Sequence, residues 1–109
     1  MRFGIPWLGA VALAASAVVY AQAEKVFDIS LSDGKVTASE ETLHVRQGDQ
    51  VMLRWKTDRP VTVHLHGYEL EAKLTPQSIT AMGFTASMPG RFPVHGSSHQ
   101  PVLYLEVQR

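Results

Sequence analysis

Five histidines are the most distinctive chemical feature of this 109-residue sequence, which contains no cysteine. His64 and His66 are two positions apart in an alternating apolar and polar run, so in a strand both side chains project from one face. Their Cα atoms are then roughly 6.5–7 Å apart, which allows both imidazoles to bind one cation through a ring nitrogen. The alternative is the solvated polar face of an edge strand. We expect this pair to take part in a metal site.

A second pair, His95 and His99, flanks a Gly-Ser-Ser loop before the last predicted strand. Loops at one end of a β-sandwich gather in space, so we expect the four rings to meet in a shared pocket at one rim of the fold. The alternative for this second pair is a flexible loop with its rings in water. His44 lies between two apolar strand residues and is expected to be a solvated surface residue.

Two other groups of residues could do chemistry. Ser97 and Ser98 lie beside histidines, but no strand–elbow–helix pattern or orienting carboxylate accompanies them, so hydrolysis is not expected. Glu69 and Glu71 could form a paired-carboxylate site, but a solvated strand edge is the expected role, because Glu is rarely buried unpaired.

Composition excludes several classes of protein. Ten Lys+Arg balance ten Asp+Glu, so there is no basic stripe of the kind that binds phosphates, and nucleic acid is not an expected partner. Without cysteine the chain has no disulfide, no thiolate metal site and no cysteine nucleophile.

The first residues are typical of a secretory signal peptide. A positive charge at Arg2 precedes an apolar run over 3–19 and the small-x-small site that ends at Ala23. We expect cleavage after Ala23, which leaves one domain at 24–109, periplasmic or secreted, with no stable membrane span. The alternative is an uncleaved anchor helix.

From residue 24 onward the hydrophobic pattern has period two and is punctuated by turn residues. Such a pattern predicts an all-β fold, an antiparallel Greek-key β-sandwich or barrel of about seven strands. The segment over 68–76 has a weaker pattern and is expected to be an irregular crossing. The expected strands are 27–31, 43–46, 51–56, 61–66, 78–87, 92–94 and 103–108.

Three runs in order, LHVRQGDQVML at 43–53, VTVHLHG at 61–67 and PGRFPVH at 89–95, resemble the cupredoxin-like domains of exported bacterial proteins. The resemblance extends from about Ser39 to Val107, and the His-x-His-Gly run is also similar to a histidine motif of multicopper oxidases. It implies a histidine ligand at His64, and it implies that the loop from His95 to Pro101 replaces the loop in which cupredoxins carry cysteine, histidine and methionine ligands. Here His95 stands near the cysteine position, and no methionine follows in the loop.

A site without thiolate cannot be a blue-copper centre. The resemblance and the ligand types together predict a copper ion held by His64, His66, His95 and His99, with Cu(II) favoured and Zn(II) or Ni(II) as competitors. We therefore expect an exported copper-handling protein, not a catalyst, with another periplasmic copper or redox protein as a partner. Two alternatives stay open: a small cupin-like metalloenzyme that adds Glu71 to the ligands, and a metal-free interaction module on the same fold.

Overall fold

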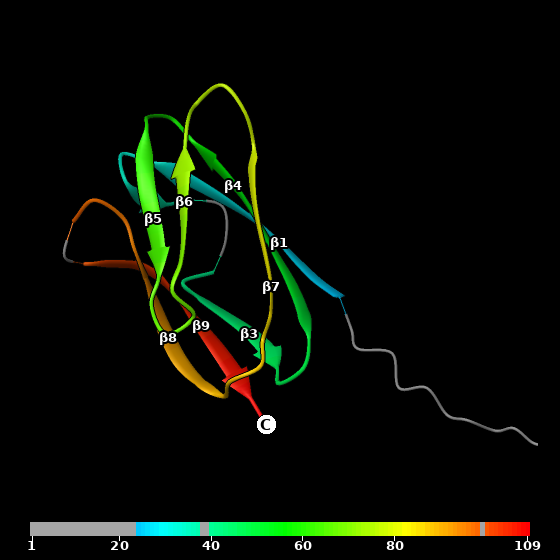
Figure 1. The fold of residues 1–109 in the computed structure, drawn as a ribbon. Coiled ribbons are helices and arrows are strands. Elements are labelled where there is room, and N and C mark those ends of the chain that lie inside the picture. The colour runs from blue at the N-terminus through cyan, green and yellow to red at the C-terminus, as the bar shows by residue number, and fades with distance from the viewer. Residues whose placement is uncertain (1–23, 38–39, 99) are drawn as a thin grey trace, which may run out of the picture.

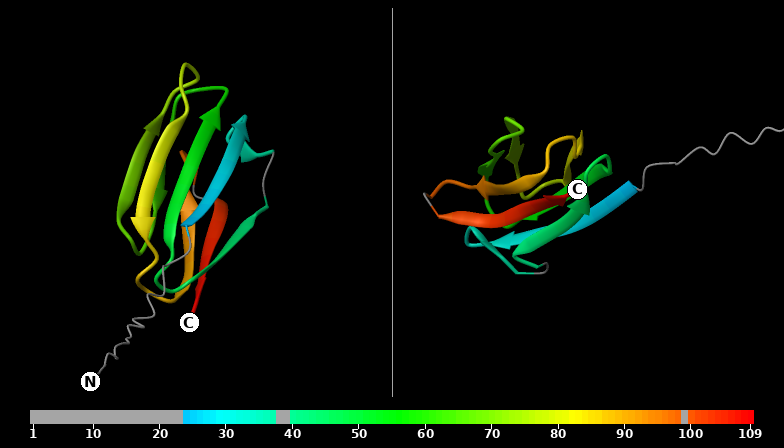
Figure 2. Two further views of the ribbon diagram at one scale, coloured as in Figure 1. Left: turned by 90° about the vertical axis from the view of Figure 1, so that its right-hand side faces the viewer. Right: turned by 90° about the horizontal axis from the view of Figure 1, so that it is seen from below.

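The computed structural model describes residues 24–37, 40–98 and 100–109, and these ranges form nine strands and no helix (Figure 1). The strands form a four-stranded sheet in the order β2-β1-β4-β7 and a five-stranded sheet in the order β3-β9-β8-β5-β6. Figure 2 shows the two sheets stacked as layers of a sandwich. The strands are β1 (Glu24–Ser32), β2 (Lys35–Val36), β3 (Thr42–Arg46), β4 (Gln50–Thr57), β5 (Val61–Leu65), β6 (Leu70–Leu74), β7 (Thr80–Thr85), β8 (Gly90–His95) and β9 (Pro101–Gln108).

The all-β sandwich predicted from the sequence is confirmed, with two corrections. Two strands were not expected, the short β2 and β6, and β6 lies in the segment predicted to be an irregular crossing. In addition, the sheets are mixed rather than antiparallel, because β1 pairs parallel with β4 and β3 pairs parallel with β9. Parallel neighbours need a crossover connection, and β3, which lies in the opposite sheet, provides it between β1 and β4.

The predicted signal peptide and its cleavage site after Ala23 lie outside the described residues, as do residues 38–39 and His99. Within the described ranges no helix has the length and hydropathy needed for a membrane crossing.

The core lies between the two sheets and is built by alternation. In β4, for example, Val51, Leu53 and Trp55 are buried while the residues between them face outward. The other long strands also bury every second side chain, and together these side chains form one continuous hydrophobic core. Its buried apolar members are Ile29, Leu31, Leu43, Val45, Val51, Leu53, Trp55, Val63, Leu65, Leu74, Met82, Ala86, Val94, Leu103, Leu105 and Val107.

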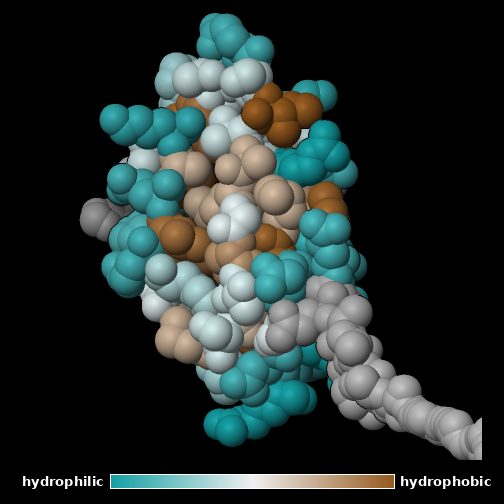
Figure 3. Space-filling model, turned by 45° about the vertical axis from the view of Figure 1, so that its right-hand side comes forward, coloured by the Kyte–Doolittle hydropathy of each residue, from teal (hydrophilic) through white to brown (hydrophobic). Residues whose placement is uncertain are grey.

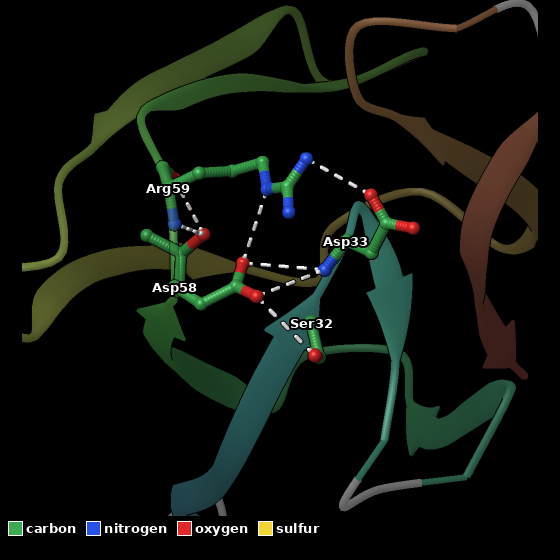
Figure 4. Close-up of polar contacts among 5 residues, drawn as sticks. Ser32, Asp33, Asp58 and Arg59 are labelled. Carbon is green, nitrogen blue, oxygen red and sulfur yellow. Dashed lines mark hydrogen bonds and ion pairs between the residues drawn. The ribbon is translucent and has the colours of Figure 1, made fainter.

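The turn between β1 and β2 is a two-residue hairpin at Asp33 and Gly34, both with positive φ. This is the geometry that Asp-Gly favours, because it matches the twist of the paired strands. Asp58, between β4 and β5, accepts hydrogen bonds from the Asp33 backbone N–H and the Ser32 hydroxyl, and Arg59 pairs with Asp33 at 2.9 Å (Figure 4). The hydrogen bond from Asp33 N–H holds the pKa of the Asp58 carboxyl below its usual range.

A turn at Gln47 and Gly48 separates β3 from β4. Gly48 has a φ of 97°, and the Asp49 carboxylate accepts a hydrogen bond from the Arg46 backbone N–H at 2.9 Å. The backbone of this turn bonds in both directions with Ala86, which follows β7. The turn therefore fixes the end of β7 against the start of β4.

The most exposed apolar side chains come from separate parts of the chain, and one face of the molecule is neutral and apolar in its middle (Figure 3). Among the described residues, Val26, Ile79 and Met88 are the large apolar side chains that are most exposed, and they come from three different parts of the chain. On the face drawn in Figure 3, neutral and apolar residues occupy the middle and hydrophilic residues surround them.

Candidate functional site

Three of the four predicted ligands come together on adjacent strands. His64 in β5 and His95 at the end of β8 are directly opposed partners, and His66 immediately follows β5. The ring centroids of His64 and His66 are 4.4 Å apart, and those of His66 and His95 are 4.7 Å apart. Residues 29 positions apart in sequence, His66 and His95, are thus brought into side-chain contact by the pairing of β5 with β8.

These histidines, referred to below as the histidine cluster, lie on the outer face of the five-stranded sheet. Val63, Leu65 and Val94 are buried, and side chains alternate along a strand, so His64 and His95 face away from the core. The expectation was a pocket among loops at one rim, and the structure places His64 and His95 on paired strands and His66 in the loop directly after β5. Strands hold side chains more rigidly than loops do.

A groove runs along the cluster on this outer face. Glu71 in β6 is the cross-strand partner of His64, so His95, His64 and Glu71 form one row across three strands. The groove is also lined by Thr62 and Lys73, which form the next cross-strand pair on one side of this row, and by Ser97 in the loop after β8. Ligand-type side chains therefore occupy the floor of an open, solvent-accessible groove.

The loop that follows His66 is held in place by close packing. Gly67 has a φ of 90°, and a Cβ built on it would lie 2.3 Å from Cδ1 of Phe92 in β8, so only glycine fits. The backbone N–H of His66 also donates to the Pro93 carbonyl at 3.0 Å. Both contacts join the loop to β8, the strand that carries His95.

Tyr68 joins the same loop to the turn before β8. Its hydroxyl donates to the Met88 carbonyl at 2.8 Å and accepts from the Met88 N–H at 3.0 Å. Its ring contacts Phe84 and Phe92, with centroids 5.2 and 4.9 Å apart. The segment beside the histidine cluster is thus fixed by the packing of Gly67 and by the hydrogen bonds and ring contacts of Tyr68.

Glu69 is the residue at this site whose role was not expected from the sequence. It has a φ of 55°, its Oε2 accepts from the Gly67 N–H at 3.2 Å, and its Oε1 lies 3.7 Å from Nε2 of His64. The expectation of a solvated position is correct, since the carboxylate is 74% exposed. No sequence pattern marks a left-handed glutamate, so its approach to His64 could not have been anticipated.

The remaining candidates are placed as follows. His44 is exposed on β3 and lies 3.2 Å from Glu106 across the strand pair, which agrees with the surface position expected for it. The Ser98 hydroxyl donates to the Gln100 carbonyl and accepts from the Gln100 N–H, so its hydrogen bonds are to local backbone. His99, the fourth predicted ligand, lies outside the described residues.

The donor types of the histidine cluster suit a divalent transition metal, because neutral imidazole is a preferred ligand of Cu(II), Zn(II) and Ni(II). The present side-chain conformations of the described residues, however, do not form a metal site. Within 24–37, 40–98 and 100–109, no three His, Asp or Glu side chains have donor atoms arranged to hold one metal ion. The rings lie in contact, tilted by 44° and edge-on at 83°, so binding one ion requires them to turn about their side-chain torsions.

Comparisons with known proteins agree with the topology. No protein-family model matches the sequence, and neither does any curated protein. Among solved structures, a copper binding protein determined by NMR in its apo form has a TM-score of 0.67 and 12% sequence identity, over 83% of this chain and 93% of that one. The fold is cupredoxin-like.

Two further structures support that assignment. Auracyanin A, a blue copper protein from Chloroflexus aurantiacus, has a TM-score of 0.60 and 14% identity, over 78% of this chain and 99% of its own. A multicopper oxidase from Pseudomonas thermotolerans has a TM-score of 0.59 and 18% identity, over 81% of this chain and 30% of its own. These neighbours share a cupredoxin-like topology, which gives no support to the cupin alternative.

Proposed function

We propose that this cupredoxin-like chain is an exported copper-binding protein that holds one Cu(II) ion through His64, His66 and His95, with His99 as a fourth ligand. The observation that carries the proposal is the contact among three imidazoles from two separate segments, with centroids 4.4 and 4.7 Å apart. The names of the structural neighbours, which are copper proteins, support the choice of metal. The signal-peptide pattern at residues 1–23 supports export.

The role we propose is copper handling, not blue-copper electron transfer. The chain has no cysteine, so no copper–thiolate bond can form, and imidazoles favour Cu(II) in a tetragonal geometry. Bound copper would supply a Lewis-acidic, exchangeable ion. The protein itself supplies two opposed strands that carry His64 and His95, and an anchored loop that carries His66.

The exposure of the histidine cluster suits transfer of an ion. His66 is exposed and the His64 side chain is 35% exposed, so both rings can turn without disturbing the core. A cluster open to solvent is also accessible to a second protein. We propose a periplasmic copper or redox protein as the exchange partner.

The test is a titration of the purified protein with Cu(II), followed by d–d absorbance and electron paramagnetic resonance. We expect one equivalent to bind with nitrogen ligands. His64→Ala and His95→Ala should each abolish or strongly weaken binding. His44→Ala is the matched control, because it removes an exposed histidine of the same sheet that lies beside Glu106, outside the cluster. Equal loss in all three variants, or no signal in the wild type, would refute the proposal.

A second candidate is a metal-free interaction module, which the side-chain conformations favour, since no described triad of ligand side chains converges. Thermal unfolding separates the two candidates. A ligand present at one hundred times its Kd stabilises a folded protein by about 2.7 kcal/mol. An unchanged Tm in excess Cu(II), Zn(II) and Ni(II) would support the module.

A further inference from the structure

Glu69 adopts a backbone conformation that glutamate rarely adopts. Its φ of 55° lies in the left-handed region, which is unfavourable for a residue with a Cβ and is usually left to Gly, Asn or Asp. Such conformations persist where the surrounding structure over-determines them, and they gather at functional sites. We therefore examine what the Glu69 side chain contacts, since glycine would adopt this backbone conformation more easily.

The carboxylate of Glu69 makes two contacts, one to backbone and one toward the histidine cluster. Oε2 accepts a hydrogen bond from the Gly67 N–H at 3.2 Å, which fixes the side chain over its own loop. Oε1 then lies 3.7 Å from Nε2 of His64. The left-handed backbone thus turns a negative charge toward one particular nitrogen.

We propose that Glu69 is a positioning residue that keeps the proton of neutral His64 on Nε2 and so leaves the lone pair of Nδ1 free to bind a metal. A carboxylate near one ring nitrogen favours the tautomer with its proton on that nitrogen, and metal-binding histidines are commonly oriented in this way by an outer carboxylate. The metal-binding part of the inference rests on the proposed function. The tautomer part concerns the metal-free protein alone.

The loop does not need Glu69 for its shape. Gly67 is fixed by its packing against Phe92, and Tyr68 is fixed by its two hydrogen bonds to Met88. Removing the carboxylate should therefore change the environment of His64 while the loop stays folded. Replacement by glycine should even relieve the backbone, because glycine adopts positive φ at no steric cost.

Glu71 provides a matched control. It is also a glutamate, two residues further on, and it is the cross-strand partner of His64, but within the described part of the chain the His64 ring pairs with the carboxylate of Glu69 instead. Glu71→Gln removes the same charge from the same face of the sheet. A generic electrostatic effect would act in both variants, and a positioning effect only at Glu69.

The experiment records long-range ¹H–¹⁵N correlations of the imidazoles in the metal-free protein, at a pH where they are neutral. In the wild type we expect His64 to carry its proton on Nε2. Glu69→Gln should lower the ratio of that tautomer to the other by about 2-fold to 5-fold, the range for an exposed charge pair. Glu69→Gly should do the same with an equal or higher Tm, and Glu71→Gln should leave the ratio unchanged.

Copper affinity is the second readout. Glu69→Gln should raise the Kd for Cu(II) by about 3-fold to 10-fold, which is below the roughly 10-fold to 100-fold effect of buried outer-shell residues, because this carboxylate is exposed. An unchanged His64 tautomer in both Glu69 variants, or an equal change in Glu71→Gln, would overturn the inference. A tautomer change together with no Cu(II) binding in the wild type would refute the proposed function and leave the positioning of His64 established.

Discussion

Gly67→Ala tests whether the loop beside the histidine cluster is fixed by its packing against Phe92. The new Cβ would meet Cδ1 of Phe92 at 2.3 Å and Cε1 at 2.7 Å, and the φ of 90° is itself unfavourable for alanine. The ring has little room to retreat, since its other neighbour is the Tyr68 ring, with centroids 4.9 Å apart. Left-handed backbone costs about 1–2 kcal/mol and overpacking about 1–3 kcal/mol, so we expect a loss of roughly 2–5 kcal/mol.

Gly34→Ala is the control that separates the two causes. Gly34 also has a positive φ, 76°, but a Cβ there would meet nothing within 4 Å, so only the backbone cost of about 1–2 kcal/mol applies. Urea unfolding followed by tryptophan fluorescence gives both free energies. The difference between the two variants should be about 1–3 kcal/mol, which is a Tm difference of at least about 4 °C for a domain of this size. Equal losses would show that Phe92 yields freely and that the loop is not fixed in this way.

Two further outcomes concern polar contacts away from the cluster. Asp58→Asn should lower the Tm at pH 7, and the Tm difference from wild type should shrink as the pH falls below about 4. A carboxyl whose pKa is lower in the folded than in the unfolded protein stabilises the fold above the unfolded-state pKa, and that stability is lost in acid. A Tm difference that is the same at every pH would contradict this. Tyr68→Phe should cost about 1–2 kcal/mol in urea unfolding, since the hydroxyl both donates to and accepts from the Met88 backbone; a loss below about 0.5 kcal/mol would show that water replaces the hydroxyl.

The fold was predictable where alternation and turn chemistry agree. Val51, Leu53 and Trp55 alternate over a long strand, and Asp33-Gly34 has the residue types of a two-residue hairpin. The pairing partners were not predictable in this way. Whether β1 meets β4 in parallel depends on where the intervening strand lies, and period two carries no information about direction.

The strand β6 shows a second limit. Leu70, Ala72 and Leu74 alternate with charged residues, but a small alanine at the centre weakens the hydrophobic signal. The strand also begins directly after the left-handed Glu69, a conformation that the sequence does not reveal. The edge of the five-stranded sheet and the row that joins Glu71 to His64 were therefore missed together.

The contact among His64, His66 and His95 was predictable from the sequence. Residues two apart share a face of a strand, and the resemblance to cupredoxin-like domains set the segment of His95 beside that of His64. The outward face of His64 was predicted correctly, whereas His95 was expected in a loop and instead ends β8, directly across from His64. His99 stays a prediction.

Under the proposed function, the carboxylates near the histidine cluster would partly neutralise the charge of a bound Cu(II) ion, which a cysteine thiolate would otherwise do. A thiolate would neutralise one positive charge of a bound Cu(II) ion, whereas neutral imidazoles neutralise none. The row of His95, His64 and Glu71 and the approach of Glu69 to His64 place two negative groups beside the histidine cluster. Both are exposed, so water screens them and their effect on affinity is modest, which suits an ion that has to be released. The pairing of β8 with β9 has a register shift between Val94 and His95, and His95 nevertheless lies directly across from His64. A strand-borne imidazole pair with carboxylates at its side is thus a physically coherent replacement for a thiolate centre, and it favours exchange of Cu(II) over rapid cycling between oxidation states.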